Sequence, residues 1–172
     1  MTTRVNGVDV EKMRDLVSSI ERDPTKAKTT WKAKTTWKGG GYVETRIRQY
    51  TVEGDEPDEL LGGGRAPNAV ESVLHALGAC LAVSVVYHAA ARDIVVNALE
   101  LEVTGELDTH GFLGLSDDVR PGYQNITVNC RVKTDAPQDA LKELWEHAQR
   151  ISPVLDILRN PEPVSLVLQR MQ

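Results

Sequence analysis

The sequence predicts an α+β domain with a mainly antiparallel sheet. Residues 72–91 contain no Asp, Glu, Lys or Arg, which indicates a long helix in the centre of the domain. Residues 99–104 and 126–133 alternate apolar and polar side chains, as half-exposed strands do. After Pro137 the apolar residues recur at helical spacing, which predicts a further amphipathic helix: Leu141, Leu144, Ala148 and Ile151.

The N-terminal segment is expected to form a helix that Asp9 caps and that ends near Pro24. Its apolar residues share a narrow stripe: Val10, Met13, Leu16, Val17 and Ile20. A narrow stripe is typical of a surface helix. We therefore predict a helical extension over residues 1–24 and a single domain over residues 25–172, a length that suffices to bury a core.

A six-residue repeat, KAKTTW, fills positions 26–37 in two tandem copies and precedes three glycines at 39–41. In a strand, Trp31 and Trp37 fall on one face with the alanines, and the lysines fall on the other. The face with the tryptophans is expected to be buried. Two extended copies span about 40 Å, which exceeds a usual strand. We predict that the copy beside the glycines pairs with a strand over residues 42–52, and that the other copy overhangs or crosses to a partner subunit.

Local patterns predict the remaining elements. Residues 53–66 are acidic and then glycine-rich, which predicts a flexible loop; its glycines also resemble an anion cradle, although they match no dinucleotide or P-loop spacing. Asn68 followed by Glu71 predicts a capping box at the start of the central helix. Residues 108–123 form a loop of a length that is often functional. Further elements are a helical turn after Ser152 and a last strand containing Val164, Leu166 and Leu168.

Charge and hydropathy favour a soluble cytoplasmic protein. The net charge is −5, with +4 in residues 1–38 and −9 in the remainder. The basic repeat resembles a nucleic-acid-binding arm, but its lysines and tryptophans face opposite ways, so no nucleic acid is expected. Residues 72–91 are long enough to span a bilayer, but their histidines and amphipathic neighbours favour a buried helix over a membrane span. The N-terminus lacks the apolar stretch of a signal peptide.

Two cysteines and four histidines are the candidates for chemistry. Cys130 shares a strand face with Val128 and Val132, which predicts a structural role. Cys80 lies in the middle of the charge-free helix, either as a small core residue or as a reactive thiol that needs a cation from elsewhere in the fold. No two histidines have a metal-binding helical spacing, so neither a metal nor a cofactor is expected: His75, His88, His110 and His147.

The segment APNAVESVLHALGACL, residues 66–81, resembles the helix of the OsmC/Ohr family of thiol-dependent peroxidases. Residues 119–128, residues 151–164 and Trp37 with its glycines look like further elements of that family. The resemblance implies an intertwined homodimer, with mainly antiparallel sheets packed on buried central helices. It also implies reduction of organic hydroperoxides or hydrogen peroxide by a thiolate that becomes a sulfenic acid, after which a second cysteine closes a disulfide.

The residues carried over from the family differ in several places. Cys80 maps onto the attacking cysteine, whereas Ser152 stands where the family has its second cysteine. The family's carboxylate position holds Val70, and the neighbouring Glu71 faces away from Cys80 and lies about 13 Å along the helix axis. The family's arginine after the hairpin glycines is absent, and the cations that are candidates to replace it are Lys38, Arg46, Arg48 and Arg65.

These matches imply a one-cysteine peroxidase in which a peroxide oxidises Cys80 and an external thiol reduces it. The alternative is a non-catalytic binding protein that keeps the family's dimer and apolar pocket. The candidate catalytic residues are Cys80, Glu71, Ser152, Lys38 and Arg65. The expected partners are a second copy of the chain, a peroxide or apolar ligand, and an external thiol, without a cofactor, a metal, nucleic acid or a membrane.

Overall fold

The structure, a computed structural model, describes residues 4–171, and residues 1–3 of the predicted N-terminal extension lie outside them. Its first half contains β1 (Arg4–Val5), β2 (Val8–Asp9), α1 (Val10–Arg22), the 3-10 turn η1 (Pro24–Ala27), β3 (Ala33–Gly39), β4 (Tyr42–Ile47), β5 (Tyr50–Gly54) and η2 (Asp58–Leu60). Its second half contains α2 (Ala69–Ala90), β6 (Val96–Glu106), α3 (Thr109–Phe112), β7 (Asn125–Thr134), α4 (Gln138–Ile151) and α5 (Pro153–Arg159).

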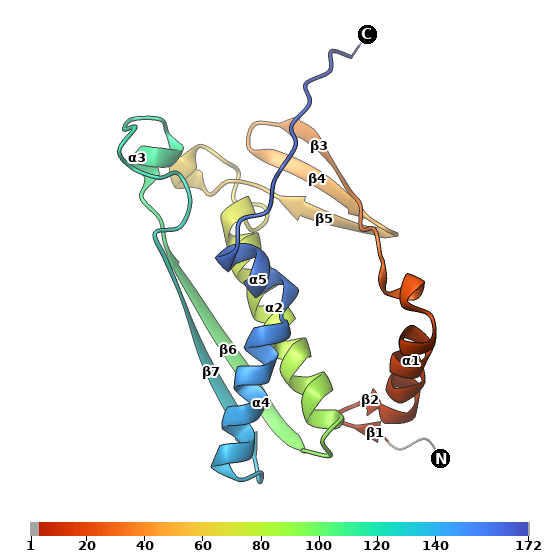
Figure 1. The fold of residues 1–172 in the computed structure, drawn as a ribbon. Helices are drawn as coiled ribbons and strands as arrows, with labels where there is room; N and C mark the ends of the chain where they lie inside the picture. Colours follow the sequence, from red (N-terminus) through yellow and green to blue (C-terminus); the bar gives the residue numbers. More distant parts are fainter. Residues whose placement is uncertain (1–3, 172) are drawn as a thin grey trace.

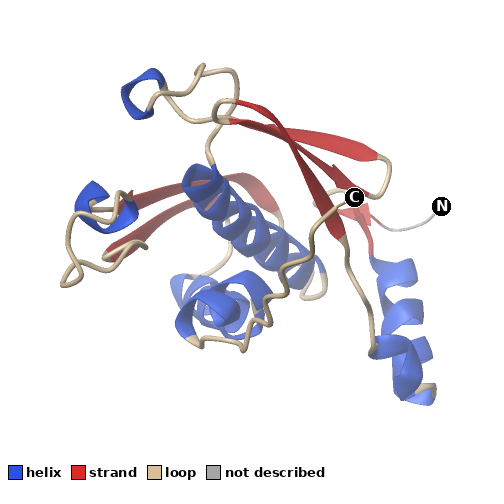
Figure 2. Cartoon of the chain, turned by 90° about the horizontal axis from the view of Figure 1, so that it is seen from above, coloured by secondary structure: helices blue, strands red, loops and turns tan. Residues whose placement is uncertain are grey.

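All strand pairs are antiparallel, which confirms the predicted α+β class. The strands form three small sheets, in the orders β1-β2, β3-β4-β5 and β6-β7. The long β6-β7 hairpin lies on one side of α2, and helices α4 and α5 also pack against α2 (Figures 1 and 2). The sheet that contains β3 lies beyond the first turn of α2, so α2 connects the two halves of the molecule.

Helix α2 begins at the predicted capping box. The Asn68 side chain accepts from the Glu71 backbone N–H at 2.9 Å, and the Glu71 carboxylate accepts from the Asn68 N–H at 2.8 Å. These two bonds satisfy donors that the first turn of a helix otherwise leaves unpaired. The sequence therefore determines where α2 begins.

The hydrophobic core lies between α2 and α4. Val85, Ala89, Leu144 and Ala148 are almost fully buried there. The opposite face of α2 is less covered, since Val83 is 51% exposed and Tyr87 is 50% exposed. The central helix is thus buried on one face within a single chain. By length and composition α2 is also apolar enough to cross a membrane, but its buried face belongs to the core of an α+β domain.

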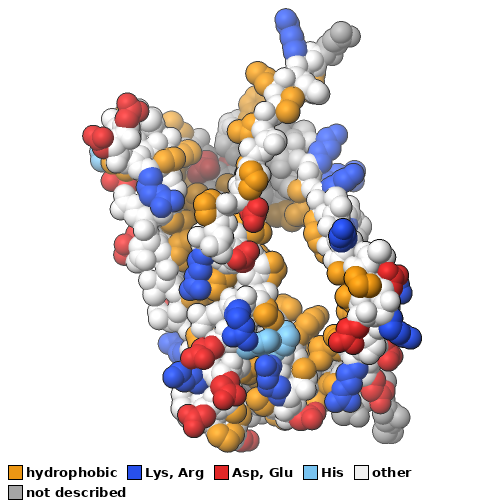
Figure 3. Space-filling model, in the orientation of Figure 1, with side chains coloured by type: hydrophobic (Ala, Val, Ile, Leu, Met, Phe, Trp, Pro, Cys, Tyr) orange, Lys and Arg blue, Asp and Glu red, His pale blue; other side chains and the backbone are white. Residues whose placement is uncertain are grey.

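The N-terminal helix α1 forms as predicted, with the Asp9 carboxylate accepting from the Lys12 N–H at 3.0 Å. Its apolar stripe remains largely open, because Leu16 is 60% exposed and Val17 is 51% exposed. Figure 3 shows an opening through the molecule between the body and the arm that α1 forms with the segment leading into β3. Helix α1 therefore lies on the surface, as its narrow stripe indicates.

The structure confirms which copy of the repeat enters the sheet. The second copy forms β3, in which Ala33 pairs with Ile47 and Trp37 pairs with Val43. The first copy begins in η1 and then continues without regular structure over residues 28–31. The expected burial of the tryptophan face is wrong for the single chain, because Trp37 is 69% exposed. Within the part of the chain that the structure describes, Ala33, Thr35 and Trp37 on that face of the sheet are all exposed.

The strand predicted over residues 42–52 is wrong as one element. It is divided into β4 and β5 by a tight turn at Arg48 and Gln49. Arg48 adopts a φ of 54°, a left-handed conformation that only a minority of non-glycine residues adopt. The turn has no Gly, Pro or Asn-Gly pair, so no residue pattern indicated it. The result is a three-stranded meander in place of a two-stranded hairpin.

The two tryptophans of the repeat are expected to differ in their effect on stability. The Trp37 indole donates to the Gly40 carbonyl at 3.0 Å and the side chain lies opposite Val43, whereas the Trp31 indole donates only to Thr29 of the unpaired copy. Trp37→Ala is expected to reduce the free energy of unfolding by about 1 kcal/mol, and Trp31→Ala by less than about 0.5 kcal/mol. Urea denaturation of both variants tests this, and equal losses would contradict the assignment of the paired copy.

The glycine-rich segment before α2 is an ordered loop that is organised around Asp55. This side chain is 3% exposed and accepts from the backbone N–H groups of Glu56 at 2.9 Å, Gly63 at 3.2 Å and Arg65 at 3.2 Å. A Cβ at position 62 would overlap the Glu56 carbonyl, which explains the glycine there. The predicted loop is therefore confirmed, and these contacts hold it together. The loop amides do bind an anion, and this anion is the protein's own carboxylate.

The last predicted strand is also wrong within one chain. Residues 160–171 have no ladder partner, and Val164, Leu166 and Leu168 are 78%, 89% and 99% exposed. The tail extends away from the body past α5 (Figure 1). Alternating residues form a strand only where they pair with a sheet edge, and residues 160–171 pair with no strand among the described residues 4–171.

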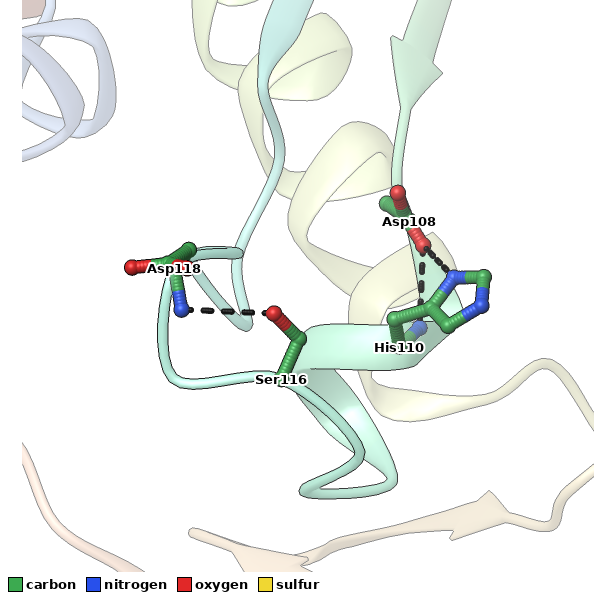
Figure 4. A network of polar contacts seen from close by, with 4 residues as sticks. All are labelled: Asp108, His110, Ser116 and Asp118. Carbon is green, nitrogen blue, oxygen red and sulfur yellow. Dashed lines mark hydrogen bonds and ion pairs between the residues drawn. The ribbon is translucent and has the colours of Figure 1, made fainter.

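The loop between β6 and β7 carries its own short helix, α3. The Asp108 carboxylate caps it by accepting from the backbone N–H and the ring Nδ1 of His110 at 2.9 and 2.7 Å, and the Asp118 N–H donates to Ser116 Oγ at 3.3 Å (Figure 4). The bond from the His110 backbone, and then that from its ring, lower the pKa of Asp108. This loop is thus held by local polar contacts, while Phe112 stays 54% exposed.

Candidate functional site

The contact between Cys80 and Ser152 is the centre of the candidate site. Cys80 lies in the middle of α2, and Ser152 lies at the junction of α4 and α5, where it is 1% exposed. The Ser152 hydroxyl donates to Cys80 Sγ at 3.2 Å, and its oxygen accepts from the Leu155 N–H at 3.4 Å. One hydroxyl therefore caps α5 and contacts the thiol. Pro153 at the first position of α5 has no N–H to satisfy, which favours this start.

The other predicted site residues make different contacts. Glu71 caps α2, as described above. Lys38 forms an ion pair with Glu44 at 2.8 Å, and this contact lowers the pKa of Glu44. The Arg65 guanidinium lies 4.5 Å from the centre of the Tyr42 ring, a cation–π contact. In residues 4–171, Ser152 is the one side chain that hydrogen-bonds to Cys80 Sγ, so the structure brings together two of the five predicted residues.

The two further candidate cations lie on the β3-β4-β5 sheet. Arg46 is an exposed residue of β4, and Arg48 lies in the turn after it, 5.3 Å from the centre of the Tyr50 ring. Neither arginine contacts Cys80 by a hydrogen bond within residues 4–171. This sheet therefore supplies no cation to the thiol within the single chain.

Cys130 lies in an apolar environment on β7, as predicted. It lines a cavity of about 270 Å³ with Val85, Val132 and Leu144, between the sheet and α4. Burial raises the pKa of the Cys130 thiol, which lowers the fraction of the reactive thiolate. No hydrogen bond in residues 4–171 joins Cys130 to the Ser152 site. These observations support the structural role.

A larger cavity of about 640 Å³ lies between α2, β7, α4 and α5. Its walls are mainly apolar and include Leu77, Leu81, Ile126, Val128, Trp145 and Leu155. Leu77 and Leu81 flank Cys80 on α2, although the cysteine itself does not line the cavity. Tyr123 and Val70 also line it, and the Tyr123 hydroxyl donates to the Val70 carbonyl at 2.8 Å. The volume and lining suit a small apolar ligand.

The histidines that sequence spacing left apart are paired by the fold. His147 Nε2 lies 3.2 Å from His88 Nδ1, and the two ring centres are 4.4 Å apart. Burial lowers the pKa of His88, and the charges of His147 and Arg92 lower it further. Desolvation also lowers the pKa of His147, together with the charges of Arg92 and Arg150. No local pattern indicated this pair, since it joins residues 59 positions apart.

Acidification is expected to destabilise the protein through this pair. A histidine whose pKa is lower in the folded chain contributes stability that is fully present above its unfolded pKa of about 6.5 and is lost as the pH falls through the folded value. The urea concentration at the midpoint of unfolding should therefore decrease as the pH is lowered from about 7 to about 5. His147→Gln should reduce this pH dependence, and His75→Gln, on the exposed side of α2, should retain it. A slope that His147→Gln leaves unchanged would exclude the pair as its source.

Comparisons with known proteins identify the family and the fold of the chain. The model of the family described as OsmC-like protein matches residues 62–167, which is more than half of the chain and includes both Cys80 and Ser152. No curated protein sequence matches the chain. The match begins within the loop before α2, so α1 and the β3-β4-β5 sheet lie outside the matched residues.

Solved structures share the fold at low sequence identity. An OsmC-like protein from Mycoplasma pneumoniae is 17% identical, with a TM-score of 0.68 over 78% of this chain and 90% of that one. An organic hydroperoxide resistance protein OsmC from Legionella pneumophila is 19% identical, with a TM-score of 0.58 over 77% and 90%. The organic hydroperoxide resistance protein OhrB of Bacillus subtilis is 18% identical, with a TM-score of 0.52 over 77% and 93%. These structures show the fold, and the family match over residues 62–167 shows that this chain belongs to the OsmC-like protein family.

Proposed function

We propose that this protein is a thiol-dependent peroxidase of one-cysteine type, in which Cys80 is oxidised by a peroxide and reduced by an external thiol. The hydrogen bond from Ser152 to Cys80 Sγ supports this proposal most directly. It puts a hydroxyl, which cannot form a disulfide, beside the reacting sulfur. Two of the similar structures are named organic hydroperoxide resistance proteins, which favours an organic hydroperoxide as the oxidant.

In the oxidation step, the Cys80 thiolate attacks the terminal oxygen of the hydroperoxide. The O–O bond breaks, the alkoxide takes up a proton and leaves as an alcohol, and Cys80 becomes a sulfenic acid. The Ser152 hydroxyl stabilises the negative sulfur as a donor, because hydrogen bonds to the charged form favour it. Since no second thiol lies at this site, the sulfenic acid persists until an external thiol reaches it.

Replacement of each cysteine tests the proposal. Cys80→Ser is expected to abolish thiol-dependent consumption of tert-butyl hydroperoxide, because it removes the attacking sulfur. Cys130→Ser is the matched control, and it should retain nearly full turnover, since this half-buried thiol on β7 lines a different cavity and makes no hydrogen bond to Ser152. Mass spectrometry with a sulfenic acid trap should label Cys80. Equal turnover in the wild type and Cys80→Ser would exclude this mechanism.

A second candidate function is the non-catalytic binding of a small apolar molecule. The cavity of about 640 Å³ beside Leu77 and Leu81 favours it. A ligand bound there should be displaced by Leu81→Trp, which fills the cavity, while Cys80→Ser should leave binding unchanged. Peroxide turnover that depends on Cys80 supports the first function over this one.

The proposed assembly is a homodimer in the cytoplasm. This chain leaves several apolar side chains open to solvent. Val83 and Tyr87 on α2, together with Leu166 and Leu168 in the tail, would be covered by a second copy of the chain. Such a dimer is also the arrangement that the sequence resemblance implies. Analytical ultracentrifugation tests it.

A further inference from the structure

Four basic side chains gather where the last turns of α2 and α4 meet. His88 lies in the last turn of α2 and Arg92 follows that helix, while His147 and Arg150 come from the end of α4. Figure 3 shows histidine side chains between basic ones on this face. Within residues 4–171, neither arginine forms an ion pair with a carboxylate. The cluster therefore carries positive charge for which the described chain supplies no paired counter-ion.

The hydrogen bonds of the cluster fix where its protons lie. A guanidinium can only donate, so the 2.8 Å contact from Arg150 makes His147 Nδ1 an acceptor. His147 then carries its proton on Nε2 and donates to His88 Nδ1 at 3.2 Å. The remaining proton of His88 is on Nε2, and it has no acceptor among residues 4–171. This N–H and the two guanidinium groups are donors suited to an anion.

The cluster and the Cys80 thiol lie along the same contact, between α2 and the α4-α5 segment. The contact of Cys80 with Ser152 and the contact of His88 with His147 both join α2 to the α4-α5 segment. Eight residues separate Cys80 from His88, which corresponds to about 12 Å along the axis of α2. Ser84 is half-buried one turn from each of them. A molecule of tripeptide size that lies outside the buried core, along the half-buried residues Cys80, Ser84 and His88, would reach both ends.

We propose that the basic cluster binds the carboxylate of the external thiol that reduces Cys80, and that it selects anionic thiols of low molecular weight. This inference rests on the proposed function, since it concerns the reductant of the sulfenic acid. A carboxylate held by Arg92 and Arg150 raises the local concentration of the attached thiol near the oxidised sulfur. The cluster thereby supplies an affinity for the reductant that the apolar surroundings of Cys80 lack.

The reduction takes place in two balanced steps. The thiolate of the reductant attacks the sulfur of the Cys80 sulfenic acid, the S–O bond breaks, and the hydroxide leaves as water with one proton. A mixed disulfide results. A second thiol molecule then attacks the reductant's sulfur in that disulfide, which releases the oxidised disulfide of the reductant and returns Cys80 to the thiol.

Binding is tested without turnover by titrating reduced protein with S-methylglutathione, which has two carboxylates and no free thiol. We expect the imidazole NMR signals of His88 and His147 to shift. Arg150→Gln, which keeps an N–H donor for His147, should weaken binding about tenfold. Lys133→Gln on the exposed face of β7 is the matched control and should bind like the wild type. Absence of any histidine shift in the wild type would overturn the inference.

The kinetic test compares glutathione with its diethyl ester, which lacks the free carboxylates. The wild type should show a KM for glutathione about tenfold below that for the ester, and Arg150→Gln should bring the two values together. Single-turnover oxidation of Cys80 by the peroxide should be equal in both proteins. Equal KM values in the wild type with normal oxidation would overturn this inference alone. Failure of Cys80 to oxidise would overturn the proposed function instead.

Discussion

Replacing Ser152 with cysteine is expected to turn Cys80 into half of a peroxide-driven intramolecular disulfide. The Ser152 oxygen already lies 3.2 Å from Cys80 Sγ, and a sulfur in its place needs to approach by about 1 Å to reach the disulfide bond length of about 2.05 Å. A thiol held at this distance reacts with the sulfenic acid as if it were present at very high concentration. It should therefore react before any external thiol does.

Thiol titration after one equivalent of peroxide measures this change. The wild type, with its two free cysteines, should lose one thiol, whereas Ser152→Cys should lose two of its three. Cys130 is the thiol that survives in both. Ser152→Ala controls for loss of the hydroxyl and should behave like the wild type in the number of thiols lost. If Ser152→Cys also lost a single thiol, the Cys80–Ser152 contact would not represent the reacting arrangement.

Asp55→Ala is expected to reduce the free energy of unfolding by about 3 kcal/mol, because it removes a buried carboxylate that accepts from three backbone N–H groups of its loop. Asp55→Asn keeps one side-chain oxygen and should cost less. The exposed Asp58→Ala is the matched control, with an expected loss of less than about 0.5 kcal/mol.

Urea denaturation followed by circular dichroism measures these losses. The two aspartates lie in the same acidic segment, so a difference between them separates the effect of the buried contacts from that of net charge. Similar losses for Asp55→Ala and Asp58→Ala would show that the loop is not organised by the buried carboxylate.

The loop also illustrates what a sequence pattern leaves open. Glycines ahead of a helix are typical both of flexible segments and of anion cradles. The deciding contact comes from Asp55, eight residues before Gly63, and nothing in the composition of the segment marks one of its acidic residues as buried. Packing of the loop against the end of β5 determines which of these acidic residues is buried.

Two predictions of burial, for the tryptophan face of β3 and for the C-terminal tail, were wrong for a different reason. The tryptophan face of β3 and the alternating tail around Leu166 have the periodicity of buried strands, yet both are exposed in one chain. Periodicity reports that a face is suited to burial and does not identify the surface that covers it. A second copy of the chain, as proposed above, would supply that surface.

The sequence by itself determined the features that depend on neighbouring residues. The start of α2 at Asn68, the alternation of β6 and β7, and the choice of the repeat copy beside the glycines all follow from local hydrogen bonds, periodicity and turn chemistry. Only the tertiary structure decided which distant side chains meet. It placed Ser152 against Cys80 and His147 against His88, because the packing of α2 on α4 and α5 fixes contacts that no local pattern encodes.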